Sequence, residues 1–120
     1  MATVSAPALT PELALQYLGE LSTDIKASVV VSADGRTAAA SKPVEAGDQL
    51  RELTKQLFER ADAVDSQTVT QVEVSTGDGA VYAVRDERWL VGVVTGRFAL
   101  SSLMFYDLRN VLGDLEGKGE

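Results

Sequence analysis

The chain has 120 residues and a net charge of −7 at neutral pH, with 18 acidic and 11 basic side chains, and 45% of its residues are hydrophobic. This length predicts one soluble globular domain, and the scattered, outnumbered basic residues argue against binding to nucleic acid or to an anionic membrane surface. Cysteine and histidine are absent, which excludes disulfides, thiolate chemistry and nearly all zinc sites, so we expect no metal and no cofactor. The same absence makes an enzyme less expected without excluding one.

A first helix is predicted to begin at Thr10-Pro11-Glu12. A threonine hydroxyl can cap the first turn, proline suits the first helical position, and an acid there complements the helix dipole. Apolar side chains then recur at intervals of three and four residues, which predicts one buried stripe. Its members are Leu13, Tyr17, Leu18 and Leu21.

Two strands joined by a tight turn are expected next, over residues 27–41. Ala27–Ser32 is continuously apolar at its centre, so both faces of this strand should be covered. Asp34-Gly35 is typical of a two-residue hairpin turn with positive φ at both central positions, and Thr37–Ser41 forms the return strand.

A second helix is predicted after the break at Ser41-Lys42-Pro43, beginning at Gly47 with Asp48 as its cap. Its apolar side chains cover a wider arc than one sheet face requires, so part of the helix is expected to pack on a partner. These side chains are Leu50, Leu53, Leu57, Phe58, Ala61 and Val64.

Three further strands are predicted, Thr68–Thr76, Ala80–Arg85 and Trp89–Thr95, separated by turns at Gly77-Asp78-Gly79 and Asp86-Glu87-Arg88. The last strand is apolar on both faces and is therefore expected to be central. The first of the three alternates polar and apolar residues, which indicates one solvated face.

A closing helix is predicted after Phe98 and Leu100, with Ser101-Ser102 capping its start and Gly113 its end. Its apolar side chains again recur at helical spacing, which predicts a buried line. The members of this line are Leu103, Met104, Leu108, Val111, Leu112 and Leu115.

The order helix, two strands, helix, three strands, helix predicts an α+β fold, a three-layer sandwich in which helices cover both faces of a five-stranded antiparallel sheet. Residues 9–115 are expected to form this single domain, with flexible segments at 1–8 and 116–120. No apolar run approaches the ~20 residues of a membrane span, and the N-terminus lacks signal-peptide features. A cytoplasmic location is therefore expected.

The strand Thr68–Thr76 is the candidate for pairing with another chain. Edge strands are normally protected by proline, lysines, a bulge or shortness, and this strand has none of these; Glu73 is its only charge. A partner strand would satisfy its backbone donors and acceptors. The alternative is an ordinary edge that Gln71 and Glu73 keep hydrated.

Patterns of residue type spread over residues 9–115 also resemble a known family. They are Leu18 and Leu21, Ala27-Ser28-Val29-Val30-Val31-Ser32-Ala33-Asp34-Gly35, Ala38-Ala39-Ala40-Ser41, Leu53 and Leu57, Val72-Glu73-Val74, Val81 and Val84, Trp89-Leu90-Val91-Gly92-Val93-Val94, and the helix from Leu103 to Leu112. The chain resembles the Roadblock family of small dimeric modules related to the dynein light chain, in a minimal prokaryotic-type form. This resemblance implies a homodimer whose second helices pack side by side and whose third strands pair into one continuous sheet.

The residues that this dimer would use lie on the second helix and the third strand. They are Leu50, Leu53, Leu57, Phe58, Ala61, Thr68, Thr70, Gln71, Val72, Glu73 and Val74. A heterodimer with a related module is left open.

The resemblance further implies a non-enzymatic module that binds a small Ras-like GTPase, or another NTPase, and modulates or localises it. Such a regulator orders the switch loops of its partner or donates a charge, which makes Arg51, Lys55 and Arg60 the candidate GTPase-binding residues. The alternative for each of them is a solvated pair with Glu52 or Glu59 on the helix surface.

Two other classes of function are left open by the residues alone. A small-molecule-sensing domain of a signalling system would need a sizeable apolar cavity with a few converging polar groups. The small residues Ala38-Ala39-Ala40 indicate close packing instead. A carboxylate-based hydrolase ranks last, because no spacing selects an acid and its partner.

Overall fold

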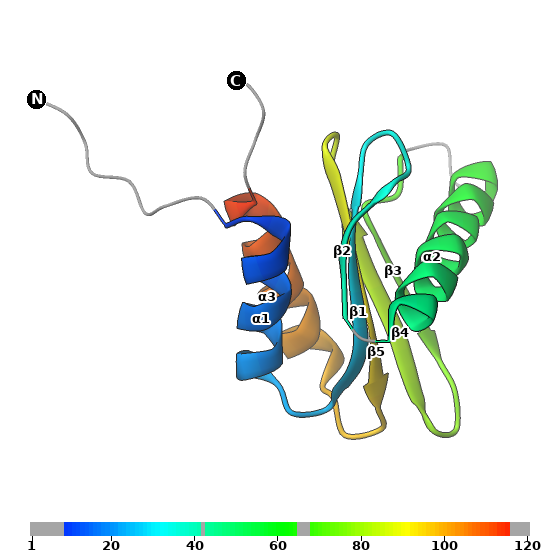
Figure 1. Ribbon diagram of the computed structural model, residues 1–120. Coiled ribbons are helices and arrows are strands. Elements are labelled where there is room, and N and C mark those ends of the chain that lie inside the picture. Colours follow the sequence, from blue (N-terminus) through cyan, green and yellow to red (C-terminus); the bar gives the residue numbers. More distant parts are fainter. Residues whose placement is uncertain (1–8, 42, 65–67, 116–120) are drawn as a thin grey trace, which may run out of the picture.

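The protein is a three-layer sandwich in which one antiparallel sheet separates two helical layers (Figure 1). The computed structural model describes residues 9–41, 43–64 and 68–115. The segments expected to be flexible, 1–8 and 116–120, lie outside the described residues. The predicted α+β class and the predicted order of helices and strands are confirmed.

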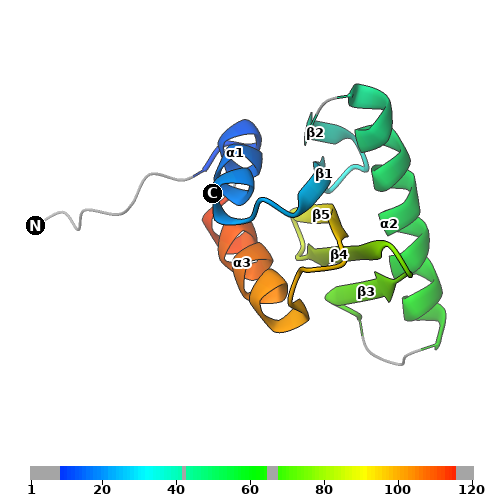
Figure 2. The same cartoon turned by 90° about the horizontal axis from the view of Figure 1, so that it is seen from below.

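Helices α1 and α3 cover one face of the sheet, and α2 covers the other (Figure 2). The strand order is β2-β1-β5-β4-β3, so β5 is central as predicted, and β2 and β3 are the two edges. No helix in the described part of the chain is both long and apolar enough to cross a membrane. The elements are α1 (Pro11–Leu21), β1 (Ile25–Ser32), β2 (Thr37–Ala40), α2 (Val44–Val64), β3 (Gln71–Ser75), β4 (Gly79–Arg85), β5 (Trp89–Gly96) and α3 (Ser101–Asp114).

Helix α1 begins as predicted, because the hydroxyl of Thr10 accepts the backbone N–H of Leu13 at 3.1 Å. Its buried side chains are Ala14 and Leu18, whereas the other members of the predicted stripe, Leu13, Tyr17 and Leu21, are exposed. The stripe prediction is wrong for these three residues. Leu13 and Tyr17 each precede a buried residue by one position, which turns their side chains about 100° away from it, and Leu21 is the last residue of the helix.

The turn between β1 and β2 differs from the predicted two-residue type. Gly35 has a φ of +86°, and no described non-glycine residue has a positive φ, so Asp34 does not adopt the expected conformation. The N–H of Gly35 donates to the carbonyl of Ser32, and the N–H of Ser32 donates to the carbonyl of Arg36, both at 2.9 Å. This is a three-residue loop, a type I turn followed by a left-handed glycine.

Each face of the sheet has its own hydrophobic core. Consecutive residues of β1 alternate between them: Val30 lies in the core under α1 and α3, while Val29 and Val31 lie in the core under α2. Both faces of β1 are therefore covered, as its uninterrupted valines predict. The α2 core also contains Leu50 and Phe58.

Helix α2 begins at Val44, three residues before the predicted start at Gly47. Gly47 is buried inside the helix, where an added Cβ would overlap the Cβ of Ala40 on β2. Glycine is needed here for the close approach of helix and strand and not for the start of the helix. Asp48 is consequently not a cap, and its carboxylate lies 3.4 Å from the guanidinium of Arg51.

Farther along α2, the contact with the sheet is made by Thr54, which is fully buried. Its hydroxyl donates to the carbonyl of Leu50 at 2.9 Å, which satisfies the buried polar group. An added Cβ at Gly92 of β5 would lie 2.9 Å from the methyl group of Thr54. The absence of a side chain at Gly92 therefore lets α2 lie close to the centre of the sheet.

The predicted buried line of α3 is correct except at Leu103, which is 55% exposed, and Phe105 is buried in addition to the predicted set. The cap predictions are wrong at both ends. The N-cap position is Leu100, with no side-chain cap, so Ser101 is already helical, and Gly113 lies inside the helix.

Candidate interaction surface

Strand β3 pairs with β4, and no other strand in the described part of the chain lies on its outer side. The register runs without interruption from Gln71 opposite Val84 to Ser75 opposite Ala80. The strand thus keeps the regular geometry that a further strand would need.

Two hydrogen bonds fix which backbone groups of β3 point outward. The N–H of Arg85 donates to the carbonyl of Thr70 at 3.0 Å, and the N–H of Thr76 donates to the carbonyl of Gly79 at 2.7 Å. Backbone groups alternate in direction along an antiparallel strand, so the groups of the residues between these two alternate as well. The outward N–H and C=O groups belong to Gln71, Glu73 and Ser75, and we call them the β3 edge.

The side chains of β3 alternate between the two faces of the sheet as predicted. Toward α3, Arg109 donates to the amide oxygen of Gln71, and the hydroxyl of Ser101 donates to Glu73 at 2.8 Å. Toward α2, Val72 packs partly buried against the core. The single charge of the strand is therefore held by a hydroxyl of the same chain, on the face of the sheet and not in the path of an added strand.

The predicted interface residues of α2 divide into two groups. Leu53 is 41% exposed, and Leu57 and Ala61 are partly exposed, so these three residues form one flank of the helix at intervals of four. We call them the α2 flank. Leu50 and Phe58 are buried under the helix, and they support the flank instead of contributing surface to it.

Arg85, at the end of β4, connects α2 with Val69, which lies two residues before β3. Its guanidinium donates two hydrogen bonds of 2.7 Å to the carboxylate of Asp62, and its Nε donates to the carbonyl of Val69 at 2.8 Å. The guanidinium also lies over the ring of Phe58, 4.2 Å from its centroid. Sequence reasoning missed this cluster, because 23 residues separate Asp62 from Arg85 and neither stands in a local motif.

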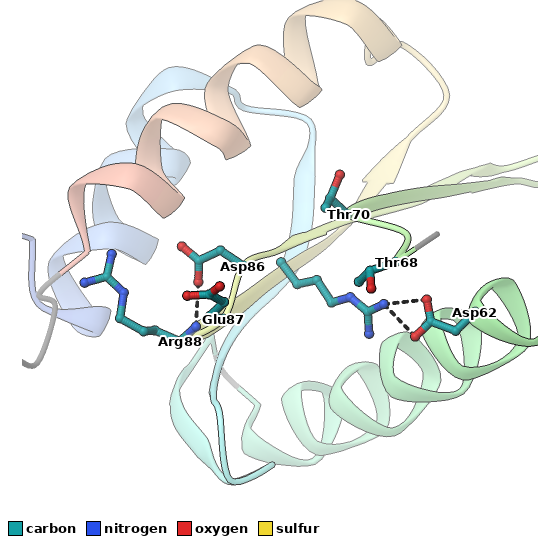
Figure 3. A pocket seen from close by; sticks show the side chains of 7 residues that line it. Asp62, Thr68, Thr70, Asp86, Glu87 and Arg88 are labelled. Carbon is teal, nitrogen blue, oxygen red and sulfur yellow. Dashed lines mark hydrogen bonds and ion pairs between the residues drawn. The ribbon is translucent and has the colours of Figure 1, made fainter. Parts of the chain in front are cut away.

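The Asp62–Arg85 pair is exposed on one side, where it borders a hollow of about 850 Å³ (Figure 3). Asp62 and Thr68 lie on one side of the hollow and Asp86, Glu87 and Arg88 on the other. Hydrogen bonds from Arg85, and then from the N–H of Val69, lower the pKa of Asp62 below its ordinary value of 3.8. The hollow is lined by Asp62, Thr68, Thr70, Arg85, Asp86, Glu87 and Arg88, none of which is an apolar residue of the kind that a sensory cavity needs.

The three candidate cations of α2 do not share one face. Arg60 follows Arg51 by nine positions, which places the two side chains about half a turn apart on a helix. Arg51 donates to the hydroxyl of Thr37 at 2.8 Å, so it helps to hold β2. Lys55 lies 4.0 Å from Glu52, on the same side of the helix as Arg51, and Arg60 is exposed.

The sequence matches no protein-family model and no curated protein. Solved structures do match the arrangement of the chain. The gliding protein MglB from Thermus thermophilus matches at a TM-score of 0.70, with 14% identity over 92% of this chain and 95% of that one. A second MglB structure, with a tetrameric arrangement, matches at 0.68, with 14% identity over 90% and 92%. A Roadblock/LC7 domain from Streptomyces avermitilis matches at 0.66, with 18% identity over 75% and 81%.

The chain has the Roadblock/LC7 fold. The similarity extends over nearly all of the chain in the MglB structures, so every layer of the sandwich takes part in it. The fold expected from the residue patterns is thereby confirmed. Within this fold, the β3 edge and the α2 flank are the predicted interface residues that remain at the surface of the chain.

Proposed function

We propose that the chain is a regulatory module of the Roadblock family that forms a homodimer through β3 and α2 and binds a small Ras-like GTPase, or another NTPase, without catalysing a reaction itself. The observation that supports this most is the β3 edge, a regular strand with outward backbone groups and no proline, lysine or bulge. The Roadblock/LC7 fold adds support, because the resemblance found in the sequence implies such a dimer.

The dimer would combine two kinds of contact. Two β3 strands in antiparallel pairing would satisfy the backbone groups of Gln71, Glu73 and Ser75 in each chain. The α2 flanks of the two chains would pack against each other, which would bury the exposed side chain of Leu53. Hydrogen bonds would thus fix the register, and apolar contact would supply most of the affinity.

The native mass of the purified chain tests the dimer. We expect twice the chain mass of 12.8 kDa, and we expect Leu53→Asp to shift the protein to the mass of one chain. Tyr106→Asp is the matched control, because Tyr106 is also exposed but lies on the opposite layer. A monomeric parent chain, or a Leu53→Asp variant that dimerises like the parent, would show that the proposed interface is wrong.

Recovery of the tagged chain from its own cells tests the GTPase. We expect a companion of roughly 20 kDa, the size of a small GTPase domain, whose binding depends on whether GTP or GDP is added. Of the three candidate cations, Arg60 is tested first, because Arg51 is already bonded to Thr37 and its loss would also disturb β2.

With the companion purified, Arg60→Ala is expected to weaken binding by on the order of tenfold, whereas Arg88→Ala, at the exposed turn before β5, should not. Addition of the chain either accelerates GTP hydrolysis or leaves the rate unchanged, which separates an activator from a scaffold. A chain that binds no nucleotide hydrolase, while remaining a dimer, would contradict this half of the proposal.

A further inference from the structure

Exposed large apolar side chains are unevenly distributed over the described surface. Four of them, Val44, Leu53, Val64 and Val74, lie on α2 and β3, the side that the proposed dimer would cover. The other seven lie on α1, α3 and the segment between β5 and α3: Leu13, Tyr17, Leu21, Phe98, Leu100, Leu103 and Tyr106. Dimerisation through β3 therefore leaves the larger group unexplained.

Part of this second group lines a hollow of about 320 Å³ where the end of α1 meets the start of α3. Its apolar wall contains Leu21, Leu100 and Leu103, together with Phe98, which is 79% exposed. We call this hollow the α1–α3 groove. Side chains as exposed as these gain free energy only when another molecule covers them.

The segment that presents Phe98 and Leu100 is held in place by Asp24. The carboxylate of Asp24 accepts the backbone N–H of Phe98 at 3.1 Å, and its carbonyl accepts the N–H of Gly96 at 3.0 Å. An added Cβ at Gly96 would overlap a carboxylate oxygen of Asp24, so the contact requires glycine there. Two hydrogen bonds to Asp24, in the connection between α1 and β1, thus hold the backbone of the segment that follows β5.

The groove continues into a ridge along α1. Leu13, Tyr17 and Leu21 are all exposed and are spaced by four residues, which gives an apolar line of roughly 12 Å on the helix surface. At the far end of α1 the N–H of Leu9 donates to the carbonyl of Asp114 at 2.7 Å, so α1 and α3 run antiparallel. An apolar line of this length matches two or three turns of an added helix.

The charged residues in the lining of the groove are the acids Asp24 and Asp107, and one cation lies at its margin, Arg97, 5.6 Å from the centroid of the Phe98 ring. A second copy of the same groove would place these two acids against like charge. A helix with basic residues beside its apolar stripe would instead meet opposite charge. We propose that the α1–α3 groove is a docking site for an amphipathic, basic helix of a partner protein.

A synthetic leucine–lysine helix of about 18 residues tests the proposal, because a peptide of that length can be helical in water. Its match is a leucine–glutamate helix with the same apolar stripe. The lysine helix is expected to bind the full chain, with NMR shift changes confined to α1 and residues 96–107, and to bind more weakly as salt is added. The glutamate helix is expected to bind on the order of tenfold more weakly or not at all.

Leu103→Ser and Phe98→Ser should each reduce the affinity for the lysine helix by on the order of tenfold, because both remove exposed anchors. Tyr106→Ser is the matched control, since Tyr106 is 62% exposed on the same helix but does not line the groove. Equal binding of the two peptides, shift changes elsewhere on the surface, or equal loss in all three variants would overturn the proposal. If the Leu103→Ser variant has a lower native mass than the parent chain in the absence of peptide, the groove serves self-association instead, and the proposal is wrong. The docking site does not depend on dimerisation through β3, which the mass of Leu53→Asp reports separately.

Discussion

The two edges of the sheet are built differently. Strand β2 has four residues, is contacted by α1 on one face and α2 on the other, and its register with β1 slips between Val30 and Val31. Strand β3 has an unbroken register; α2 packs on it through Val72, and on the other face it meets polar side chains of α3. A bulge interrupts the β2 edge, and no bulge interrupts the β3 edge. The difference agrees with the proposed pairing of a second chain with β3 and not with β2.

The largest expected effect concerns the anchor that holds α2 over the β3 half of the sheet. Phe58→Ala removes a buried ring that lies under Arg85, and it should lower the free energy of unfolding by about 3–5 kcal/mol. Urea denaturation measures the loss. Leu53→Ala is the control, because Leu53 is partly in solvent and its truncation should cost less than about 1.5 kcal/mol. Similar losses for the two variants would mean that Phe58 is not the anchor.

Proline substitutions in β3 and in β2 test directly whether the two edges differ in dimerisation. Glu73→Pro removes an outward N–H of the β3 edge, and it should raise the dimer dissociation constant by at least about tenfold in sedimentation measurements. Ala38→Pro is the matched change in β2, at the extra residue of the bulge, and it should leave dimerisation intact. Glu73→Ala controls for the lost bond to Ser101. Equal weakening by both prolines would show that the two edges are not distinct.

A smaller effect is expected where α2 crosses the protected edge. Gly47→Ala places a methyl group against Ala40 and should cost about 1–3 kcal/mol of overpacking, reduced by the ~1 kcal/mol that alanine gains in a helix. Gly113→Ala, in α3, should gain the helix stability of alanine without overpacking, because nothing lies within 4 Å of its added Cβ. Thermal unfolding should therefore separate the two variants in opposite directions. Stabilisation by both would disprove the close approach at Ala40.

The smallest effect concerns Asp62, whose pKa is lowered by its hydrogen bonds to Arg85 and to the N–H of Val69. A lowered pKa contributes stability that is present above the ordinary value of 3.8 and is lost as the pH falls through the lower, folded value. Asp62→Asn should thus lower Tm slightly at neutral pH, with a gap that closes in acid. High salt should shrink the gap as well. A gap that does not narrow as the pH falls below 3.8 would mean that the effect is not electrostatic.

Local rules explain most of what the sequence predicted correctly. The cap at Thr10, the uninterrupted valines of β1 and the central position of β5 all follow from neighbouring residues, so no tertiary information was needed. The errors arise where two elements meet. The local pattern places the start of a helix at Gly47, although the role of this glycine depends on Ala40, seven positions earlier on β2.

The surfaces are harder to predict for the same reason. Helical spacing identifies apolar lines, but it does not say which side of the line meets the sheet, and so it assigns Leu103 and Leu13 wrongly to the core. Likewise, the spacing of Arg51, Lys55 and Arg60 contains no sign that Arg51 is bonded to Thr37. Which backbone groups of β3 point outward can be deduced only from the register of β3 with β4.

The sheet separates α1 and α3 from α2 (Figure 2), and this arrangement determines on which side of a dimer the two α1–α3 grooves would lie. Antiparallel pairing of two β3 strands about a twofold axis perpendicular to the sheet would leave both α1–α3 grooves on the same side of the enlarged sheet. A partner with two basic helices on one chain would then bind its second helix intramolecularly, at an effective concentration on the order of millimolar for a short linker. Pairing through β3 would in this way let two α1–α3 grooves bind one partner chain with a higher overall affinity than a single groove has.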